Sequence, residues 1–76
     1  MPLVNIKTMR GALSDAQKAE LHRKVTDLMV EIEGQGRPQF RPFVTVMIEE
    51  LEPRNWSMGG KPASDDFVRR ITGRTA

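Results

Sequence analysis

The sequence has no cysteine, a single histidine and no long apolar run, and each shortage excludes a class of site. Without cysteine, disulfide bonds and thiolate metal sites are ruled out, and His22 alone cannot make a metal site. No segment reaches the roughly 18 apolar residues of a membrane span, and no basic segment followed by an apolar core marks a secretory signal. We therefore expect a cytoplasmic protein that uses no metal or other cofactor.

Charge of one sign is never concentrated. Lys and Arg number 12 against 10 Asp and Glu, which gives a net charge of +2. The basic residues are spread along the chain, so the footprint of a nucleic-acid-binding surface is missing. The pI near 9.5 instead suits a small anionic substrate.

The chain of 76 residues is predicted to form one small domain, residues 1–76. A chain this short buries only about 60–65% of the surface that its unfolded form exposes. Small domains usually compensate with disulfides, a metal or partner subunits. Because the first two are excluded, we expect this chain to form oligomers.

The first half of the sequence predicts a strand followed by a helix. Residues 2–9 alternate in a way that favours a strand. Ser14 and Gln17 have the spacing of a capping box at a helix start, and Gly34 and Gly36 are expected to end that helix. Its apolar stripe is expected to contain Leu21, Val25, Leu28, Met29 and Ile32.

The second half predicts another strand, a hairpin and a short helix. Residues 43–49 are rich in β-branched side chains, and because both faces of this strand are mostly apolar, both should be covered. The intervening helix favours a β-α-β unit with parallel strands. The paired glycines in residues 56–62 fit a tight hairpin. Ser64 is positioned to cap a final helix over residues 65–72, and the last residues should fray.

Pro2 is the plainest candidate for a catalytic group. Aminopeptidases remove Met1 readily when the next residue is small, and Pro2 then becomes a secondary amine that can accept a proton. A general base works best with a pKa near ambient pH, and a free α-amino group already lies near ~8. An apolar pocket or nearby positive charge would lower that pKa further. If Met1 stays in place, the Pro2 nitrogen is an amide and has no such chemistry.

These motifs, in this order, resemble the 4-oxalocrotonate tautomerase family. The likeness is carried by Pro2, the helix start, the second strand, the hairpin and the Ala-Ser pair after it, which are residues 2, 14–18, 44–50, 55–60 and 63–64. It covers a core of residues 2–64 and leaves residues 65–76 as a short C-terminal helix and tail. The resemblance implies an α/β (α+β) fold, one β-α-β unit with parallel strands and a C-terminal hairpin, assembled into trimers or hexamers.

The resemblance also implies an isomerase in which Pro2 is the base for keto-enol tautomerisation of a 2-oxo acid. Related proteins use two arginines from neighbouring subunits to hold substrate carboxylates, but this sequence has Ala12 (or Leu13) and Thr45 at those places. Arg10, Arg41 and Arg37 are the cations that could substitute, and Trp56 corresponds to an aromatic residue lining the site. Candidate substrate-binding residues are therefore Arg10, Trp56, Thr45 and Arg41.

The missing arginines favour a monocarboxylate, such as an aryl 2-oxo acid, over a dicarboxylate. Two alternatives stay open. The first alternative is a subsidiary or non-catalytic subunit of a hetero-oligomer whose partner supplies the arginines. The second is a hydratase, dehalogenase or decarboxylase relative in which protonated Pro2 acts as an acid. The expected partners are a small 2-oxo acid or enol and further copies of the chain, without nucleic acid or membrane.

Overall fold

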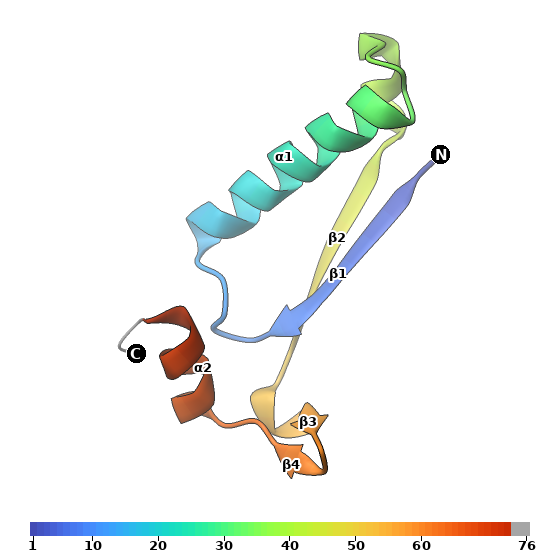
Figure 1. Cartoon of the computed structure of the whole chain (residues 1–76). Coiled ribbons are helices and arrows are strands. Elements are labelled where there is room, and N and C mark those ends of the chain that lie inside the picture. The colour runs from blue at the N-terminus through green and yellow to red at the C-terminus, as the bar shows by residue number, and fades with distance from the viewer. Residues whose placement is uncertain (74–76) are drawn as a thin grey trace.

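The computed structural model describes residues 1–73 (Figure 1). The described elements are β1 (Leu3–Met9), α1 (Asp15–Ile32), the 3-10 helix η1 (Pro38–Phe43), β2 (Thr45–Leu51), the 3-10 turn η2 (Pro53–Asn55), β3 (Ser57–Met58), β4 (Lys61–Pro62) and α2 (Asp65–Thr72). Residues 74–76, which belong to the predicted C-terminal tail, lie outside the described residues. Within residues 1–73, no helix is both long and apolar enough to cross a bilayer.

Strands β1 and β2 pair in parallel, which confirms the predicted β-α-β unit. The register runs from Leu3 opposite Thr45 to Met9 opposite Leu51. Helix α1 packs against β2 and lies along one side of the strand pair (Figure 1). The other side is open in a single chain, since Leu3 is 62% and Met47 46% exposed. A single chain therefore leaves this face uncovered, and the expectation that both faces are covered stays a prediction about the assembly.

Helix α1 begins at the predicted cap. The Ser14 hydroxyl accepts a hydrogen bond from the Gln17 backbone N–H at 3.2 Å, and the Gln17 side chain accepts one from the Ser14 N–H at 2.8 Å. The apolar stripe is only partly covered, because Leu28 and Ile32 are more than half exposed. A pair of strands is too narrow to cover the whole apolar width of this helix.

The end of α1 and the start of β2 differ from the sequence expectation. Backbone φ is positive at Gln35 and Gly36 but not at Gly34; Gly34 is needed because an added Cβ would lie 2.7 Å from the Phe40 ring. The second strand runs over Thr45–Leu51 rather than 43–49, and Phe43 ends η1. Two prolines in residues 38–42 explain the shift, because proline fixes φ and cannot donate to a strand ladder.

The C-terminal part forms the hairpin and the capped helix that were predicted. Gly59 and Gly60 both have positive φ, as a type I′ hairpin turn requires. The Ser64 hydroxyl accepts the Phe67 N–H at 3.1 Å and begins α2. The core lies here: Met9, Ala63 and Val68 are its buried members, and Ala12, Trp56 and Phe67 pack against them.

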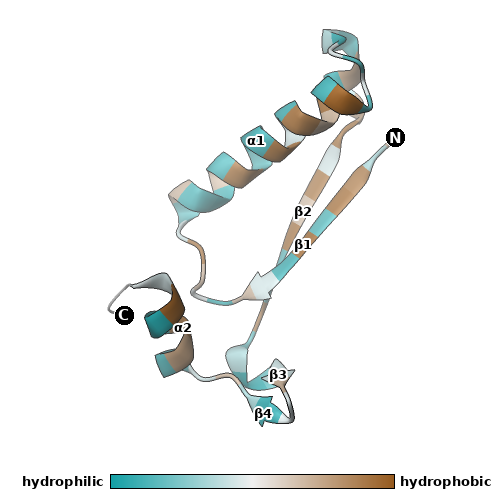
Figure 2. Ribbon diagram, viewed as in Figure 1, coloured by the Kyte–Doolittle hydropathy of each residue, from teal (hydrophilic) through white to brown (hydrophobic). Residues whose placement is uncertain are grey.

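A single chain is flat and extended, with extents of 43 × 25 × 14 Å. Its radius of gyration is 15.4 Å, whereas a compact domain of this length has about 11 Å. Its accessible surface is 5602 Å², against roughly 4,700 Å² for a compact monomer of this mass. Hydrophobic segments lie along both main strands and α1 (Figure 2). This shape leaves apolar surface for other subunits to cover.

Candidate active site

Pro2 lies at the open end of the strand pair. Its carbonyl accepts a hydrogen bond from the Thr45 backbone N–H at 3.0 Å, and the residue is half-buried. This bond fixes the backbone of Pro2 at its carbonyl group. The Pro2 nitrogen lies one residue before Leu3, the first residue of β1 that pairs with β2. Met1, which precedes it, has an 87% exposed side chain. Removal of Met1 would leave the Pro2 amine at a fixed position on the end of β1.

Thr45 and Arg41 lie on the segments at the same end of the chain as Pro2. Thr45 is exposed and begins β2 opposite Leu3. Arg41 belongs to η1 and not to β2. Its Nη1 lies 2.7 Å from Asp27 Oδ1 on α1. Arg37 is engaged locally, since its Nε donates to the Gly34 carbonyl at 3.0 Å.

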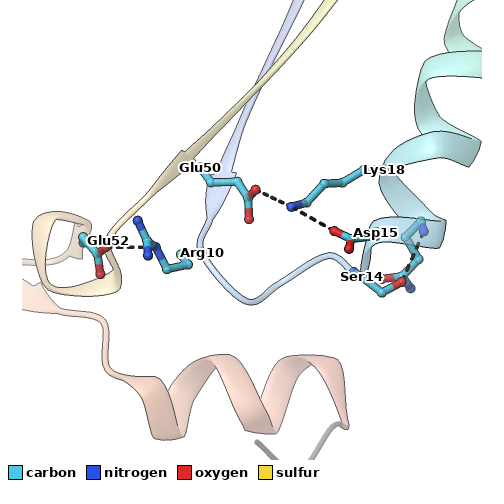
Figure 3. Close-up of polar contacts among 7 residues, drawn as sticks. Arg10, Ser14, Asp15, Lys18, Glu50 and Glu52 are labelled. Atoms are coloured by element: carbon cyan, nitrogen blue, oxygen red, sulfur yellow. Dashed lines mark hydrogen bonds and ion pairs between the residues drawn. The ribbon is translucent and has the colours of Figure 1, made fainter.

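Arg10 lies at the opposite end, directly after β1. Its backbone N–H donates to the Leu51 carbonyl at 2.8 Å and so extends the strand ladder. The Arg10 Nε lies 2.9 Å from Glu52 Oε1, and the arginine side chain is 68% exposed (Figure 3). The guanidinium therefore has a fixed partner and an open outer side.

Trp56 is half-buried near the same end. Its N–H donates to the Pro53 carbonyl at 3.0 Å, and its carbonyl accepts the Ala63 N–H at 2.7 Å. Its side chain packs against the Met9–Ala63–Val68 core together with Ala12 and Phe67. Ala12, which stands where the resemblance implies an arginine, is thus part of an apolar cluster.

The predicted site residues are divided between the two ends of one chain. Pro2 and Arg10 are separated by eight residues of extended backbone, or about 26 Å at 3.3 Å per residue. Figure 1 shows the N-terminus at one end and the hairpin with α2 at the other. One chain therefore brings Pro2 and Thr45 together, with Arg41 on the neighbouring segment, but not Pro2 with Arg10 or Trp56.

Two charged contacts near the Arg10 end were missed by the sequence analysis. Glu52 faces Arg10, a pairing that only the register of β1 and β2 could have suggested. Lys18 of α1 contacts Glu50 at the end of β2 and lies 3.7 Å from Asp15 Oδ1 (Figure 3). The hydrogen bond that the Lys18 ammonium group donates to the Glu50 carboxylate raises the pKa of Lys18. This second contact ties the start of α1 to the sheet.

A hollow of about 330 Å³ lies beside Glu52, between η2 and the start of α2. Its lining is mixed and contains both charged and small residues: Glu52, Pro53, Arg54, Ala63, Ser64 and Asp65. It is therefore at the Arg10 end of the chain and is distant from Pro2. It offers polar groups to a small molecule but no proline amine.

Comparisons with known proteins identify the family. The family model described as "Tautomerase enzyme" matches residues 2–66. The chain is 35% identical over 66 residues to "Probable tautomerase K2" of Dickeya dadantii, which covers 86% of this chain and 91% of that protein. It is 32% identical over 63 residues to a "Probable tautomerase" of Helicobacter pylori, which covers 80% of this chain and 87% of that protein.

Solved structures share the fold. YwhB, described as a homologue of 4-oxalocrotonate tautomerase, superposes with a TM-score of 0.69 at 33% identity, over 84% of this chain and 97% of that one. TomN, a 4-oxalocrotonate tautomerase homologue in the tomaymycin biosynthetic pathway, gives 0.71 at 27% identity, over 96% and 100% of the two chains. With the parallel strand pair, the intervening helix and the hairpin, these matches show that the chain belongs to the tautomerase family.

Proposed function

We propose that Pro2, once Met1 is removed, is the general base of a small oligomeric enzyme that interconverts the enol and keto forms of a 2-oxo acid. Family membership supports tautomerase chemistry. The observation that carries the proposal is the position of Pro2, whose carbonyl is held by Thr45 while its nitrogen lies at the end of β1. A base held in this way needs little further ordering before proton transfer.

The reaction requires only a proton to move between two substrate atoms. In ketonisation, the enol hydroxyl loses a proton and C3 gains one, so the composition of the substrate does not change. Pro2 carries that proton, and negative charge develops on the C2 oxygen beside the carboxylate. A cation placed at those oxygens stabilises the transition state more than the ground state.

The binding groups favour a monocarboxylate with an apolar tail. Ala12 lies in an apolar cluster with Trp56 and Phe67, so a second carboxylate would meet no cation there. Arg10 is an exposed cation at that end of the chain and directly follows β1. We assign the substrate carboxylate to Arg10 and the aryl or alkyl tail to the wall formed by Trp56.

The site is assembled from two copies of the chain. About 26 Å of strand separates Pro2 from Arg10 in one chain, so the Arg10 that serves a given Pro2 comes from a neighbour. The exposed apolar residues Leu3 and Met47 on the open sheet face provide the surface for such contacts. A homotrimer or homohexamer follows as the working assembly.

Turnover of phenylenolpyruvate by the Met1-free protein tests the proposal. Intact-mass spectrometry first establishes that Met1 is gone, and ketonisation is then followed by the loss of enol absorbance. Replacing Pro2 with Ala leaves a primary amine in place of the secondary one and should lower kcat by up to about 10²–10⁴-fold, the usual contribution of a general base. Unchanged kcat in the Pro2→Ala protein, or equal activity with Met1 retained, would exclude Pro2 as the base.

One observation favours a second candidate function. Neither Ala12 nor Thr45 can bind a carboxylate as arginine does, so a different partner subunit that carries these arginines would complete a dicarboxylate site. The chain would then be the subsidiary subunit of a hetero-oligomer. Native mass spectrometry after co-expression with genomic neighbours distinguishes the two, because a homo-oligomer with turnover by itself contradicts this alternative.

A further inference from the structure

Glu52 contacts Arg10 at one particular part of the guanidinium group. The close contact joins Glu52 Oε1 to Arg10 Nε at 2.9 Å. A carboxylate at Nε lies on the side of the planar group, so the outer edge formed by the two terminal amino groups remains open. That edge is the one that can hold a second carboxylate through two parallel N–H···O bonds. The 68% exposure of the Arg10 side chain leaves this edge accessible to solvent.

Arg41, the other arginine paired with a carboxylate among the candidates, is held differently. Asp27 Oδ1 contacts its Nη1 at 2.7 Å, so one of the two terminal amino groups is already engaged. A substrate carboxylate at that edge would have to compete with Asp27. The two ion pairs therefore have opposite consequences: Asp27 occupies the binding edge of Arg41, whereas Glu52 orients Arg10 and leaves its edge open.

We propose that Glu52 is a positioning residue that holds the Arg10 guanidinium in the orientation that receives the substrate carboxylate. The inference rests on the proposed function, in which the ligand is a 2-oxo acid. Arginine keeps its charge at all working pH values, so the pairing costs Arg10 no proton. Because Glu52 already restrains the long Arg10 side chain, that side chain loses less conformational freedom when a ligand binds.

Glu52 also places Arg10 relative to the apolar wall. It directly precedes η2, and its carbonyl accepts the Asn55 N–H at 2.9 Å, which fixes the turn that leads into Trp56. Trp56 in turn packs against the core that contains Met9, the residue before Arg10. The turn that begins at Glu52 thus positions both the Arg10 guanidinium, through the Glu52 side chain, and the Trp56 ring. This arrangement suits a ligand in which a carboxylate is joined to an apolar group.

Binding of benzoylformate, measured by titration calorimetry, tests this role without turnover. Benzoylformate is an aryl 2-oxo acid with no hydrogen on the carbon next to the ketone, so it cannot enolise. Glu52→Ala should weaken its affinity about threefold to tenfold, because ordering one long side chain on binding costs roughly that factor. Glu52→Gln keeps an acceptor for Nε and should restore most of the affinity. Circular dichroism and native mass of each variant establish that fold and assembly are unchanged.

Four controls separate positioning from a general effect of charge. In an Arg10→Ala background, Glu52→Ala should have no further effect on binding. Arg54→Ala, which removes a neighbouring positive charge, and Asp27→Asn, which releases Arg41, should each leave the affinity within about twofold of wild type. Methyl benzoylformate, which lacks the carboxylate, should bind with an affinity that none of these variants changes.

The outcomes that overturn the proposal are distinct. Tighter binding in both Glu52→Ala and Glu52→Gln would show that Glu52 only repels the ligand. Independent, additive effects of Glu52→Ala and Arg10→Ala would show that the two side chains do not act together. If Pro2→Ala leaves turnover unchanged while the binding pattern holds, the base assignment fails and the role of Glu52 stands.

Discussion

If Pro2 and Arg10 serve the same site from different chains, two inactive variants should restore activity when they are combined. The pair to combine is Pro2→Ala and Arg10→Ala. The first replaces the secondary amine of Pro2 with the more mobile primary amine of alanine and should lose up to about 10²–10⁴-fold in kcat. The second loses charged hydrogen bonds to the carboxylate, which are worth roughly 1.5–3 kcal/mol, or a factor of about 10–150 in kcat/KM.

The size of the recovery follows from the separation of these residues along β1. About 26 Å of extended strand lies between them, so a site that uses both residues must take its proline from one chain and its arginine from another. In assemblies formed at random from equal amounts of the two variants, about one quarter of the sites receive both native residues. Kinetics with phenylenolpyruvate should therefore recover to about a quarter of the wild-type rate per site, well above either variant alone.

The assay needs subunits that exchange, so the two variants are unfolded together in denaturant and refolded as a mixture. Separately refolded proteins that are mixed afterwards give the baseline, and native mass spectrometry with a mass-tagged variant confirms hybrid assemblies. A refolded mixture no more active than the mean of its parents, despite confirmed hybrids, would refute the shared site. Wild-type activity of Arg10→Ala alone would refute the part assigned to Arg10.

Three further predictions concern stability. Gly34→Ala places a Cβ 2.7 Å from both the Phe40 ring and the Val30 carbonyl oxygen, so it should lower the free energy of unfolding by about 1–3 kcal/mol. Urea denaturation measures this cost, which should be smaller in a Phe40→Ala background, and an unchanged free energy of unfolding in Gly34→Ala would contradict the prediction. Hydrogen bonding to Glu50 raises the pKa of Lys18 above its ordinary 10.5, so the stabilisation is complete below that pH and is lost as pH rises through the higher folded pKa. The Tm advantage of wild type over Lys18→Gln should accordingly stay constant to about pH 10 and shrink above it. Finally, because assembly would cover the exposed apolar surface and stabilise the folded chain, Tm should fall when the protein is diluted. A Tm that stays constant on dilution, even at concentrations where the assembly dissociates into single chains, would contradict this.

The parts of the fold that were predicted correctly are those that neighbouring residues determine. Ser14 and Gln17 satisfy each other's backbone groups within one turn, and Ser64 caps α2 in the same way. The turn at Gly59 and Gly60 needs positive φ at two successive positions, which paired glycines permit. Because each of these features depends on residues a few positions apart, a single sequence is sufficient to identify it.

The start of β2 shows where local pattern is insufficient. Phe43 and Val44 have the side chains of a strand, but η1 extends through Phe43 and the ladder begins at Thr45. The choice depends on tertiary contacts, since Phe40 lies close against Gly34, which favours a compact turn over an extended strand. Hydrophobic periodicity carries no information about such a contact between a glycine and an aromatic ring in an irregular connection.

Covered and uncovered apolar faces also look alike in a sequence. Leu28 and Ile32 continue the stripe that contains Leu21 and Met29, yet the first pair is more than half exposed in one chain and the second is half-buried. The periodicity of a helix shows that an apolar face exists, but not whether the same chain or another copy covers it. The same reasoning applies to Leu3 on the open face of the sheet.

The candidate site was predicted as a set of residues but not as an arrangement. Pro2 follows from its chemistry, while the contact between Arg10 and Glu52 follows from the register of two strands that are far apart in sequence. That register places the cation next to a carboxylate at Nε, and this contact determines which edge of the guanidinium can receive a ligand. The alanine at position 12, where the family resemblance implies an arginine, packs in the apolar cluster with Trp56. Under the proposed function, this cluster excludes a second charge, and a single oriented arginine is sufficient for a ligand with a single carboxylate.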